Sequence, residues 1–307
     1  MQETRRGVLS ALADGPMSGP ELADDLGVSR AAIWKHVEAL REAGFEIDSG
    51  DEGYRLVSVP EFGAEAVEFC LEAPFSVEYH DSIASTNDRA RELADAGATD
   101  VVVLADEQTG GRGRLDRRWA SPSGGIWFSV VCRPALPPAH VPIYTLAAAV
   151  ATAEALRSVG VDAGIKWPND VLSGEGRKLV GILTEMEGEA DRVSWVVVGI
   201  GINANVDAGA VPRAATTLRA EVGDVERAAL TCDVLDRFDE LRADPDSVLP
   251  RWRSLSLTLG RRVRVETPVE TIVGEAVAVE HPGTLVVQTD TGERRVSAGD
   301  CEHLRPA

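Results

Sequence analysis

The chain has 307 residues, which is enough for two domains and a small third one. Its 44% hydrophobic and 26% charged residues are typical of a globular protein and exclude the fibrous and disordered classes. We find no apolar run of about 18 residues and no apolar leader after Met1, so we expect a cytoplasmic protein without a membrane span. The 50 acidic residues outnumber the 31 basic ones, and the formal net charge of −19 is spread along the chain.

Lysine is almost absent from this sequence. Of the 31 basic residues 28 are arginine, and the remaining three are Lys35, Lys166 and Lys178. A surface rich in acid and poor in lysine is typical of an extreme halophile, where strong screening tolerates a high net charge. Mutational bias in a GC-rich genome replaces lysine in the same way. In either case lysine persists where a compact ammonium group is needed, so the three lysines are candidates for function.

The cysteines and histidines do not form a recognisable site. Cys70, Cys132, Cys232 and Cys301 lie far apart without a C-x-x-C pair, so we expect buried thiols rather than zinc ligands or disulfides. The five histidines show neither an H-E-x-x-H motif nor nearby Ser and Asp partners. The sequence therefore gives no support to a metalloprotease, a triad hydrolase or any other protein-bound metal site.

Residues 1–60 show the pattern of a winged helix-turn-helix domain. A helix over 4–13 is followed by the capping box Ser18–Glu21, which begins a short second helix. The turn Gly27–Ser29 then leads into a longer helix over 30–43. Two short strands complete the domain as a β-hairpin wing. We expect these strands at 45–47 and 54–57.

The longer helix has the features of a DNA-recognition helix. Lys35 projects nearly opposite the apolar face that is formed by Ile33, Val37 and Leu40. Ser29 and Arg30 lie at the first turn, where recognition helices meet bases and phosphates, so we expect DNA contacts at Ser29, Arg30 and Lys35. The domain holds six basic and eleven acidic residues, whereas DNA binding depends on basic phosphate contacts. A helical module for protein interaction is therefore the alternative.

The central part of the chain alternates strands and helices. Residues 58–60 form a short linker, and 61–73 are predicted to be a connecting helix that ends before Pro74. From Phe75 onward the pattern predicts a mixed sheet covered by helices, which is an α+β architecture. The predicted elements are strands at 76–80, 101–105, 126–132, 178–186 and 192–201, and helices at 86–96 and 143–159.

Several short segments of this central part concentrate polar chemistry. Ser85–Asn87 stands at a helix start and, taken alone, is an ordinary helix cap. Gln108–Arg114 supplies three glycines for close backbone approach and two arginines that suit a phosphate or carboxylate. Lys166–Asp170 and Gly176–Lys178 each hold a rare lysine. Gly199–Asn203 ends the predicted strand at 192–201 and resembles a turn that allows close backbone approach. Because neither a Walker A nor a complete G-x-G-x-x-G occurs, we expect a phosphate-handling site of another kind.

These segments, in this order, closely resemble the biotin–protein ligases. Ser29–His36 is similar to the subgroup that also represses the biotin operon, and the resemblance covers nearly the whole chain. It implies three domains: the winged helix-turn-helix at 1–60, a mixed-sheet catalytic domain of the class II synthetase type at 61–258, and an SH3-like barrel at 259–307.

The resemblance also implies a reaction and its partners. The enzyme joins biotin to ATP, holds biotinyl-5′-AMP and transfers biotin to one lysine of a biotin carboxyl carrier protein, with Mg²⁺ on the phosphates. No enzyme nucleophile is required, so the protein has to orient two anions and neutralise their charge. A homodimer bound to operator DNA is implied as well, with no membrane partner.

The roles of individual residues follow from the same resemblance. Lys178 and Arg112 are implied to be catalytic, and Asp170 to orient or deprotonate the carrier lysine. The chain departs from the repressor subgroup at Leu115–Arg117, where Asp116 is expected to alter how the loop closes. Biotin contacts are implied for Ser85, Thr86, Asn87, Gln108, Gly111, Arg112, Gly113, Arg114 and Lys178. Adenylate contacts are implied for Arg114, Trp119, Lys178 and Asn203.

Other functions remain open at this stage. One is a biotin-sensing transcription factor without catalysis, and another is a ligase whose N-terminal domain does not bind DNA. The pair Arg112 and Lys178 argues against the sensor, because binding biotin alone requires no phosphate-neutralising pair. Lipoate ligation on a related fold is a more distant alternative.

Overall fold

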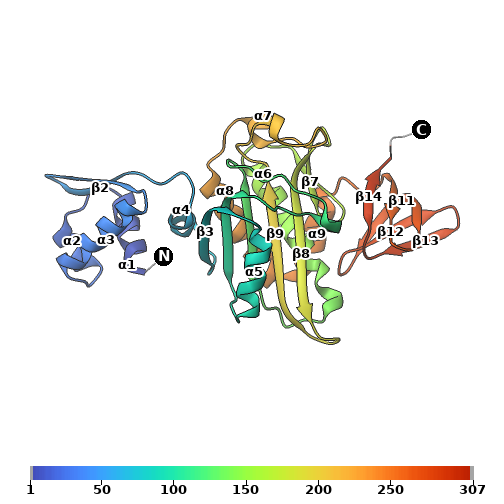
Figure 1. The fold of residues 1–307 in the computed structure, drawn as a ribbon, viewed down its shortest axis with the longest axis horizontal. Helices are drawn as coiled ribbons and strands as arrows, with labels where there is room; N and C mark the ends of the chain where they lie inside the picture. The colour runs from blue at the N-terminus through green and yellow to red at the C-terminus, as the bar shows by residue number, and fades with distance from the viewer. Residues whose placement is uncertain (1–2, 305–307) are drawn as a thin grey trace.

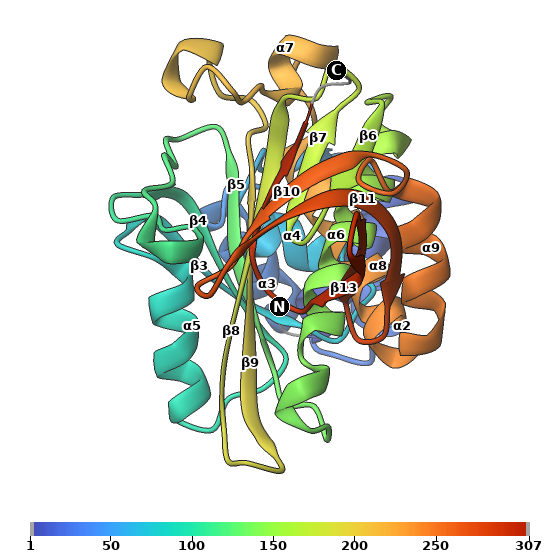
Figure 2. The same cartoon turned by 90° about the vertical axis from the view of Figure 1, so that its right-hand side faces the viewer.

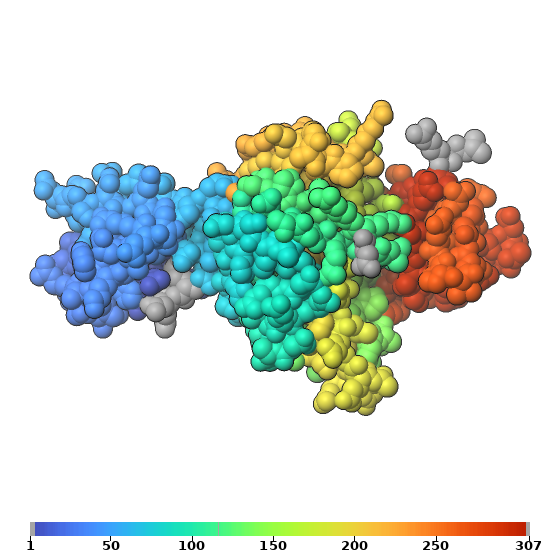
Figure 3. Space-filling model, viewed as in Figure 1, coloured from blue at the N-terminus to red at the C-terminus, as the bar shows by residue number. Residues whose placement is uncertain are grey.

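The molecule consists of three parts in a row, as the computed structural model shows (Figures 1 and 3). The structure describes residues 3–304, apart from the side chains of Glu3 and Asp116. A small helical part leads into a large central sheet, and a small sheet of antiparallel strands follows at the other end (Figure 1). The predicted α+β architecture is confirmed.

The N-terminal part is the expected winged helix-turn-helix. Ser18 and Glu21 form a reciprocal capping box, Ser29 caps the recognition helix, and Gly27 between the helices has a φ of +65°. The wing strands are longer than predicted, because they continue to Gly50 and Gly53, which pair with each other around a two-residue turn. The elements are α1 (Glu3–Ala13), α2 (Gly19–Asp25), α3 (Arg30–Glu42), β1 (Glu46–Gly50) and β2 (Gly53–Ser58).

The connecting helix α4 (Ala64–Cys70) is much shorter than the predicted 61–73. Gly63 before it has a φ of +147°, which a helix does not accommodate, and Leu71 after it is extended. The prediction was wrong at both ends because the helical spacing of apolar residues does not reveal backbone breaks of this kind.

The central part is a seven-stranded sheet with helices on both faces (Figure 2). Only the β3–β4 pair is parallel among its strand pairs in the described range; the others are antiparallel. The strand order is β3-β4-β5-β9-β8-β7-β6. The strands are β3 (Ser76–Ile83), β4 (Val101–Gln108), β5 (Ile126–Cys132), β6 (Ala163–Lys166), β7 (Asp170–Ser173), β8 (Lys178–Gly188) and β9 (Val193–Ile202).

Side chains along each strand alternate between the two faces of the sheet, so one strand supplies apolar residues to the cores on both sides. On β4, Val103 packs under α5 (Thr86–Asp95), whereas its neighbours Val102 and Leu104 face the main core on the other side. That core lies against α6 (Pro142–Ser158), α8 (Arg227–Ala243) and α9 (Val248–Leu255), and a short helix α7 (Leu218–Val222) follows β9. The short hairpin β6–β7 and the helices α7, α8 and α9 were not predicted from the sequence.

One helical segment, Pro138–Ser158, is long and apolar enough by composition to cross a membrane, contrary to our reading of the sequence. In the protein 72% of its most apolar window is buried. The segment is therefore the central core helix, and its apolar character comes from packing on several sides rather than from lipid.

The C-terminal part is a five-stranded antiparallel sheet that curls on itself (Figure 2), and we call it the C-terminal sheet. Its apolar residues Val263, Val265 and Val287 belong to the same continuous core as the central domain. The strands are β10 (Arg262–Glu266), β11 (Thr271–Glu280), β12 (Thr284–Thr289), β13 (Gly292–Val296) and β14 (Asp300–His303).

Two of the four cysteines, Cys70 and Cys232, are not the free thiols that the sequence predicts. Cys70 of α4 and Cys232 of α8 form a disulfide, with their Cα atoms 6.1 Å apart, although 162 residues separate them in the sequence. The prediction of buried thiols is wrong for this pair because the fold packs α4 against α8. Cys132 and Cys301 are free and buried as expected, and burial raises their pKa values to about 12 and about 11, which keeps them protonated.

Candidate active site

A pocket of about 250 Å³ opens on the face of the central sheet that carries α5. It collects residues from the start of α5, the middle of β8 and β9, the loop after β4 and the C-terminal sheet. Most of the predicted site residues line it: Ser85, Thr86, Asn87, Gln108, Arg112, Gly113, Arg114, Trp119, Asp170 and Lys178.

The start of α5 forms one end of the pocket. Ser85 caps the helix by accepting a hydrogen bond from the backbone N–H of Asp88 (3.3 Å). The backbone N–H and the hydroxyl of Thr86 both donate to Gln108 Oε1, at 2.8 and 3.1 Å. Gln108 Nε2 in turn donates to Ser121 Oγ (3.0 Å). These contacts fix the orientation of the partly buried Gln108 side chain, and a polar group held in this way is what a site for a small polar ligand requires.

Asn87 lies deeper, between the helix and the sheet. Its Nδ2 donates to Glu185 Oε2 (2.7 Å), and its Oδ1 accepts from Ser129 Oγ (2.6 Å). A Cβ on Gly199 would lie only 2.0 Å from Asn87 Oδ1. Gly199 and Gly201 are residues of strand β9, as the predicted strand at 192–201 implies, so the expected turn does not begin at Gly199. The expected close approach is present, because the missing side chains of these glycines leave room for other groups.

Trp119 is the second side chain that occupies space left by glycines of the sheet. A Cβ on Gly201 would lie 2.8 Å from its Nε1, and a Cβ on Gly181 would lie 3.1 Å from its ring. In the part of the chain that the structure describes, this indole nitrogen is buried without an acceptor. A buried N–H of this kind is costly unless a partner arrives, so it indicates a place where a ligand can bind.

Lys178, the first residue of β8, faces the same ring. Its Nζ lies 4.8 Å from the centre of the Trp119 ring and 2.6 Å from Asp170 Oδ1. Its backbone pairs with Ala214 and Thr216, so the residue is anchored on its main chain. The ammonium group is thus fixed at the edge of the pocket by a carboxylate and an aromatic face.

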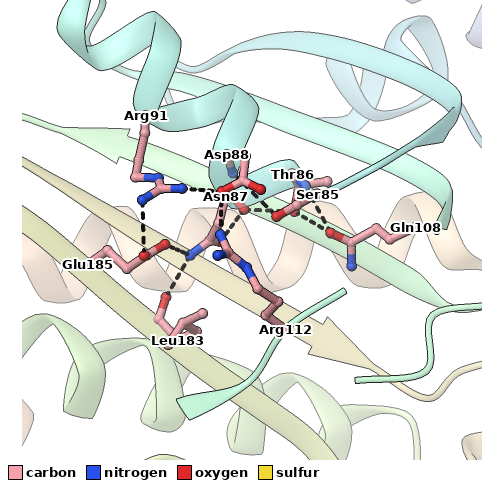
Figure 4. A network of polar contacts seen from close by, with 10 residues as sticks. Ser85, Thr86, Asn87, Asp88, Arg91, Gln108, Arg112, Leu183 and Glu185 are labelled. Atoms are coloured by element: carbon pink, nitrogen blue, oxygen red, sulfur yellow. Dashed lines mark hydrogen bonds and ion pairs between the residues drawn. The ribbon is translucent and has the colours of Figure 1, made fainter. Parts of the chain in front are cut away.

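The Gly111–Arg114 loop is tied to its surroundings at both ends. Arg112 forms an ion pair with Asp88 of α5 (Figure 4). Arg114 donates to Asn169 Oδ1 (3.0 Å) and to the carbonyl oxygen of Gly299 (2.9 Å). Burial lowers the pKa of Arg114, although Asp300 and Asp170 oppose this effect.

The C-terminal sheet completes the loop's anchorage. Arg117 pairs with Asp300 Oδ2 at 2.6 Å, and this contact raises the pKa of Arg117. Asp300 itself lines the pocket. Leu115, which directly follows the loop, is 75% exposed with a φ of +56°. The side chain of Asp116, expected to affect closure, lies outside the described residues.

Some predicted residues do not line the pocket. Asn203 is buried and donates to the carbonyl oxygen of Thr216 (3.0 Å). Gly111, the first residue of the loop, is buried, and a Cβ on it would lie 2.6 Å from Ser121 Oγ. Lys166, on β6, is also outside the lining of this pocket.

Sequence reasoning missed several lining residues. Asn169 was detectable, because it stands inside the Lys166–Asp170 segment. Asp300 carried no signal, since it comes from a separate part of the chain and reaches the pocket only through the tertiary fold.

The face of α3 that is expected to contact DNA is exposed. Arg30 and Lys35 are both exposed, whereas Ile33 and Val37 are buried. Trp34, which sequence reasoning passed over, is 56% exposed on the same helix.

Comparisons with known proteins agree with this arrangement. Residues 79–203 match the biotin/lipoate A/B protein ligase family, 5–55 match an HTH domain, and 258–304 match the biotin protein ligase C terminal domain. The fold and the pocket thus define a ligase of the biotin/lipoate class with an attached helix-turn-helix.

Relatives that match nearly the whole chain identify the family within this class of ligases. The bifunctional ligase/repressor BirA of Bacillus subtilis is 37% identical over 306 residues, covering 93% of each chain. BirA of Escherichia coli is 32% identical and covers 92% of each. The biotin protein ligase of Aquifex aeolicus, solved in complex with biotin and ATP, matches 74% of this chain and 99% of its own with a TM-score of 0.64 and 27% identity. The chain belongs to the bifunctional biotin ligase/repressor family.

Proposed function

We propose that the pocket joins biotin to ATP, retains biotinyl-5′-AMP and passes biotin to one lysine of a biotin carboxyl carrier protein. The observation that carries the proposal is the meeting of three features around one pocket: a polar helix start, a glycine and arginine loop, and Lys178. A biotin sensor without catalysis would need the first feature alone.

The biotin end of the site is the start of α5. Ser85, Thr86 and Gln108 supply donors and acceptors for the ureido head, while Asn87 braces the helix against β8 and β9. The Gly111–Arg114 loop covers the ligand with its backbone, and Arg112 contributes by holding this loop in place. Lys178 neutralises the biotin carboxylate as it meets the phosphate.

The nucleotide end is the region around Trp119. Its ring offers a stacking face for adenine, and its Nε1, which has no acceptor among the described residues, offers a donor to the ligand. Arg114 and Lys178 supply positive charge near the phosphates. Asn203, whose side chain is engaged with Thr216, supports the ribose or phosphate region from behind.

Mg²⁺ is proposed as a companion of the phosphates rather than as a resident ion. Within the described range, no group of three or more His, Cys, Asp or Glu side chains is placed to hold a metal. Of the carboxylates that line the pocket, Asp170 is paired with Lys178 and Asp300 is paired with Arg117. Such a site fits an ion that arrives with ATP and keeps its waters, supplying extra charge neutralisation on the phosphates.

The test is adenylate formation by the whole chain. Purified protein is mixed with biotin, Mg²⁺ and ATP that is labelled at the α-phosphate, in high salt, and labelled biotinyl-5′-AMP is measured. We expect adenylate with biotin and none with lipoate in its place. Binding of biotin without any adenylate would establish the sensor instead.

The helix-turn-helix is proposed to bind operator DNA as part of a homodimer in the cytoplasm. The exposed Arg30 and Lys35 on α3, together with Ser29 at its cap, support DNA contact. Two weak modules that are joined in one dimer bind two half-sites far more tightly than either binds alone. The acidic balance of this domain favours the interaction module as the second candidate.

A further inference from the structure

The side chain of Arg112 is held by a carboxylate of the neighbouring helix α5. Asp88, on the first turn of α5, pairs through one oxygen with both Arg112 and Arg91 (Figure 4). The side chains of Asp88 and Arg112 are 40% and 36% exposed. An exposed pair is easily broken and re-formed, so it suits a reversible closure.

The contacts of Asp88 continue into the sheet. Arg91 also pairs with Glu185 of β8 (3.6 Å), and Glu185 accepts the hydrogen bond from Asn87 (Figure 4). Asp88 therefore joins the loop to a helix turn that is itself braced against the sheet. The other side of the loop is held separately, by the contacts of Arg114 and Arg117 with the C-terminal sheet.

We propose that Asp88 is a positioning residue that holds Arg112, and with it the Gly111–Arg114 loop, closed over the bound biotinyl adenylate. This inference rests on the proposed function of the pocket. Asp88 acts through Arg112 and not on the substrate. The adenylate is a reactive mixed anhydride, so a closed loop keeps it from water and from unintended amines.

The same ion pair has an opposite interpretation, in which Asp88 competes with the substrate for Arg112 and inhibits the enzyme. The geometry favours the interpretation in which Asp88 helps to retain the adenylate. Asp88 ties the loop to the helix turn that carries Ser85 and Thr86, whereas an inhibitory pair would draw the loop away from that end of the pocket. The two interpretations predict effects of opposite sign.

The experiment measures how fast the whole chain releases labelled biotinyl-5′-AMP after a chase with unlabelled biotin and ATP. Arg112→Ala opens the loop, so we expect rapid release and indiscriminate labelling of added proteins. Asp88→Asn should speed release about two- to fivefold, as expected for one exposed ion pair. The KM for biotin should rise by a similar factor with kcat of adenylation unchanged, and Asp88→Glu should restore both values.

Three controls separate positioning from a structural effect. Glu92→Gln removes a carboxylate from the same helix, where it pairs with Arg89, and should leave release unchanged. Asp88→Asn should add nothing in an Arg112→Ala background, because the partner is already absent. The difference between Asp88→Asn and the parent should shrink as salt screens the pair.

The outcomes are distinct. Slower release or a lower KM for biotin in Asp88→Asn would mean that Asp88 inhibits, and would overturn the proposal. Parental release in Asp88→Asn with rapid release in Arg112→Ala would overturn the role of Asp88 alone. Parental release in both variants would show that the loop is not the lid, and the proposed role of the loop would fail with it.

Discussion

Lys178 is held between a carboxylate and an indole ring at the edge of the pocket. The side chains of Lys178 and Asp170 are 29% and 19% exposed, so water screens their interaction only in part. A cation that is fixed before the substrate arrives stabilises developing charge without further reorganisation. Asp170 keeps this cation in place, which gives it a role before any contact with the carrier lysine.

Lys178→Ala should lower the rate of adenylate formation a few hundredfold, which corresponds to about 3–4 kcal/mol of transition-state stabilisation. The fold should persist, because the backbone of residue 178 keeps its pairing with Ala214 and Thr216. Single-turnover formation of labelled adenylate measures the effect. Lys166→Ala is the matched control, since it removes another lysine outside the pocket. Near-parental turnover by Lys178→Ala would exclude this residue from the mechanism.

At the scale of elements, strand β9 shapes the pocket because two of its residues are glycines, which have no side chain. A side chain on Gly199 would meet Asn87, and one on Gly201 would meet Trp119. Because both residues are glycines, the strand can pass directly beneath these two side chains. Short runs of glycine in a strand often mark such close approaches. The sequence predicted a close backbone approach at this motif, but it did not identify Asn87 and Trp119 as the neighbours, because spacing alone does not reveal which side chain fills the space.

Gly199→Ala should displace Asn87 from its contacts with Glu185 and Ser129, because the new Cβ would lie 2.0 Å from Asn87 Oδ1. Overpacking of this kind costs about 1–3 kcal/mol, so urea unfolding should shift accordingly and biotin affinity should fall. Gly209→Ala is the control, since the added Cβ there meets no atom within 4 Å. Equal stability and affinity in both variants would contradict the assigned packing.

The attachment of β14 to the central part includes a histidine. His303 Nε2 lies 3.0 Å from Thr258 Oγ1, which also accepts from the backbone N–H of Trp167 (2.9 Å). Burial lowers the pKa of His303 to about 4, and the charges of Lys166 and Arg261 act in the same direction. The unfolded chain, with a histidine pKa near 6.5, therefore binds this proton first as the pH falls.

This shift gives a pH dependence of stability. The contribution of neutral His303 is complete above about pH 6.5 and is lost as the pH falls toward 4. Between pH 7 and 4.5 the parent should lose about 1–2 kcal/mol more unfolding free energy than His303→Gln, which has no titrating ring. Urea denaturation at both pH values measures the difference, and the carboxylates common to both proteins cancel. Identical losses would contradict the role of His303.

At the scale of the whole molecule, the recognition helix α3 lies in the N-terminal part, whereas β8 and β9, whose residues line the pocket, lie in the central part (Figure 1). The N-terminal core, which includes Leu9, Ile33 and Leu40, forms a cluster of its own, distinct from the main core. A change on the exposed face of α3 should therefore leave the ligase site intact.

Lys35→Ala should lower affinity for DNA from the protein's own promoter and leave biotinylation unchanged. A good base contact contributes roughly 1–3 kcal/mol, and the loss should appear in a binding titration at high salt. Addition of biotin and ATP should tighten binding by the parent if the adenylate favours the dimer. A parent that does not bind this DNA with or without the two substrates would make the N-terminal part an interaction module, and the ligase function would stand.

Elements whose signals lie in neighbouring residues could be predicted from the sequence alone. The caps at Ser18 and Ser29, the strand at 126–132 and the order of the polar segments needed only neighbouring residues, and the resemblance to the biotin–protein ligases rested on that order. Tertiary structure decided what depends on distant contacts. The Cys70–Cys232 disulfide, the pairing of Arg112 with Asp88 and the arrival of Asp300 at the pocket join residues far apart in the chain, where spacing and periodicity carry no information.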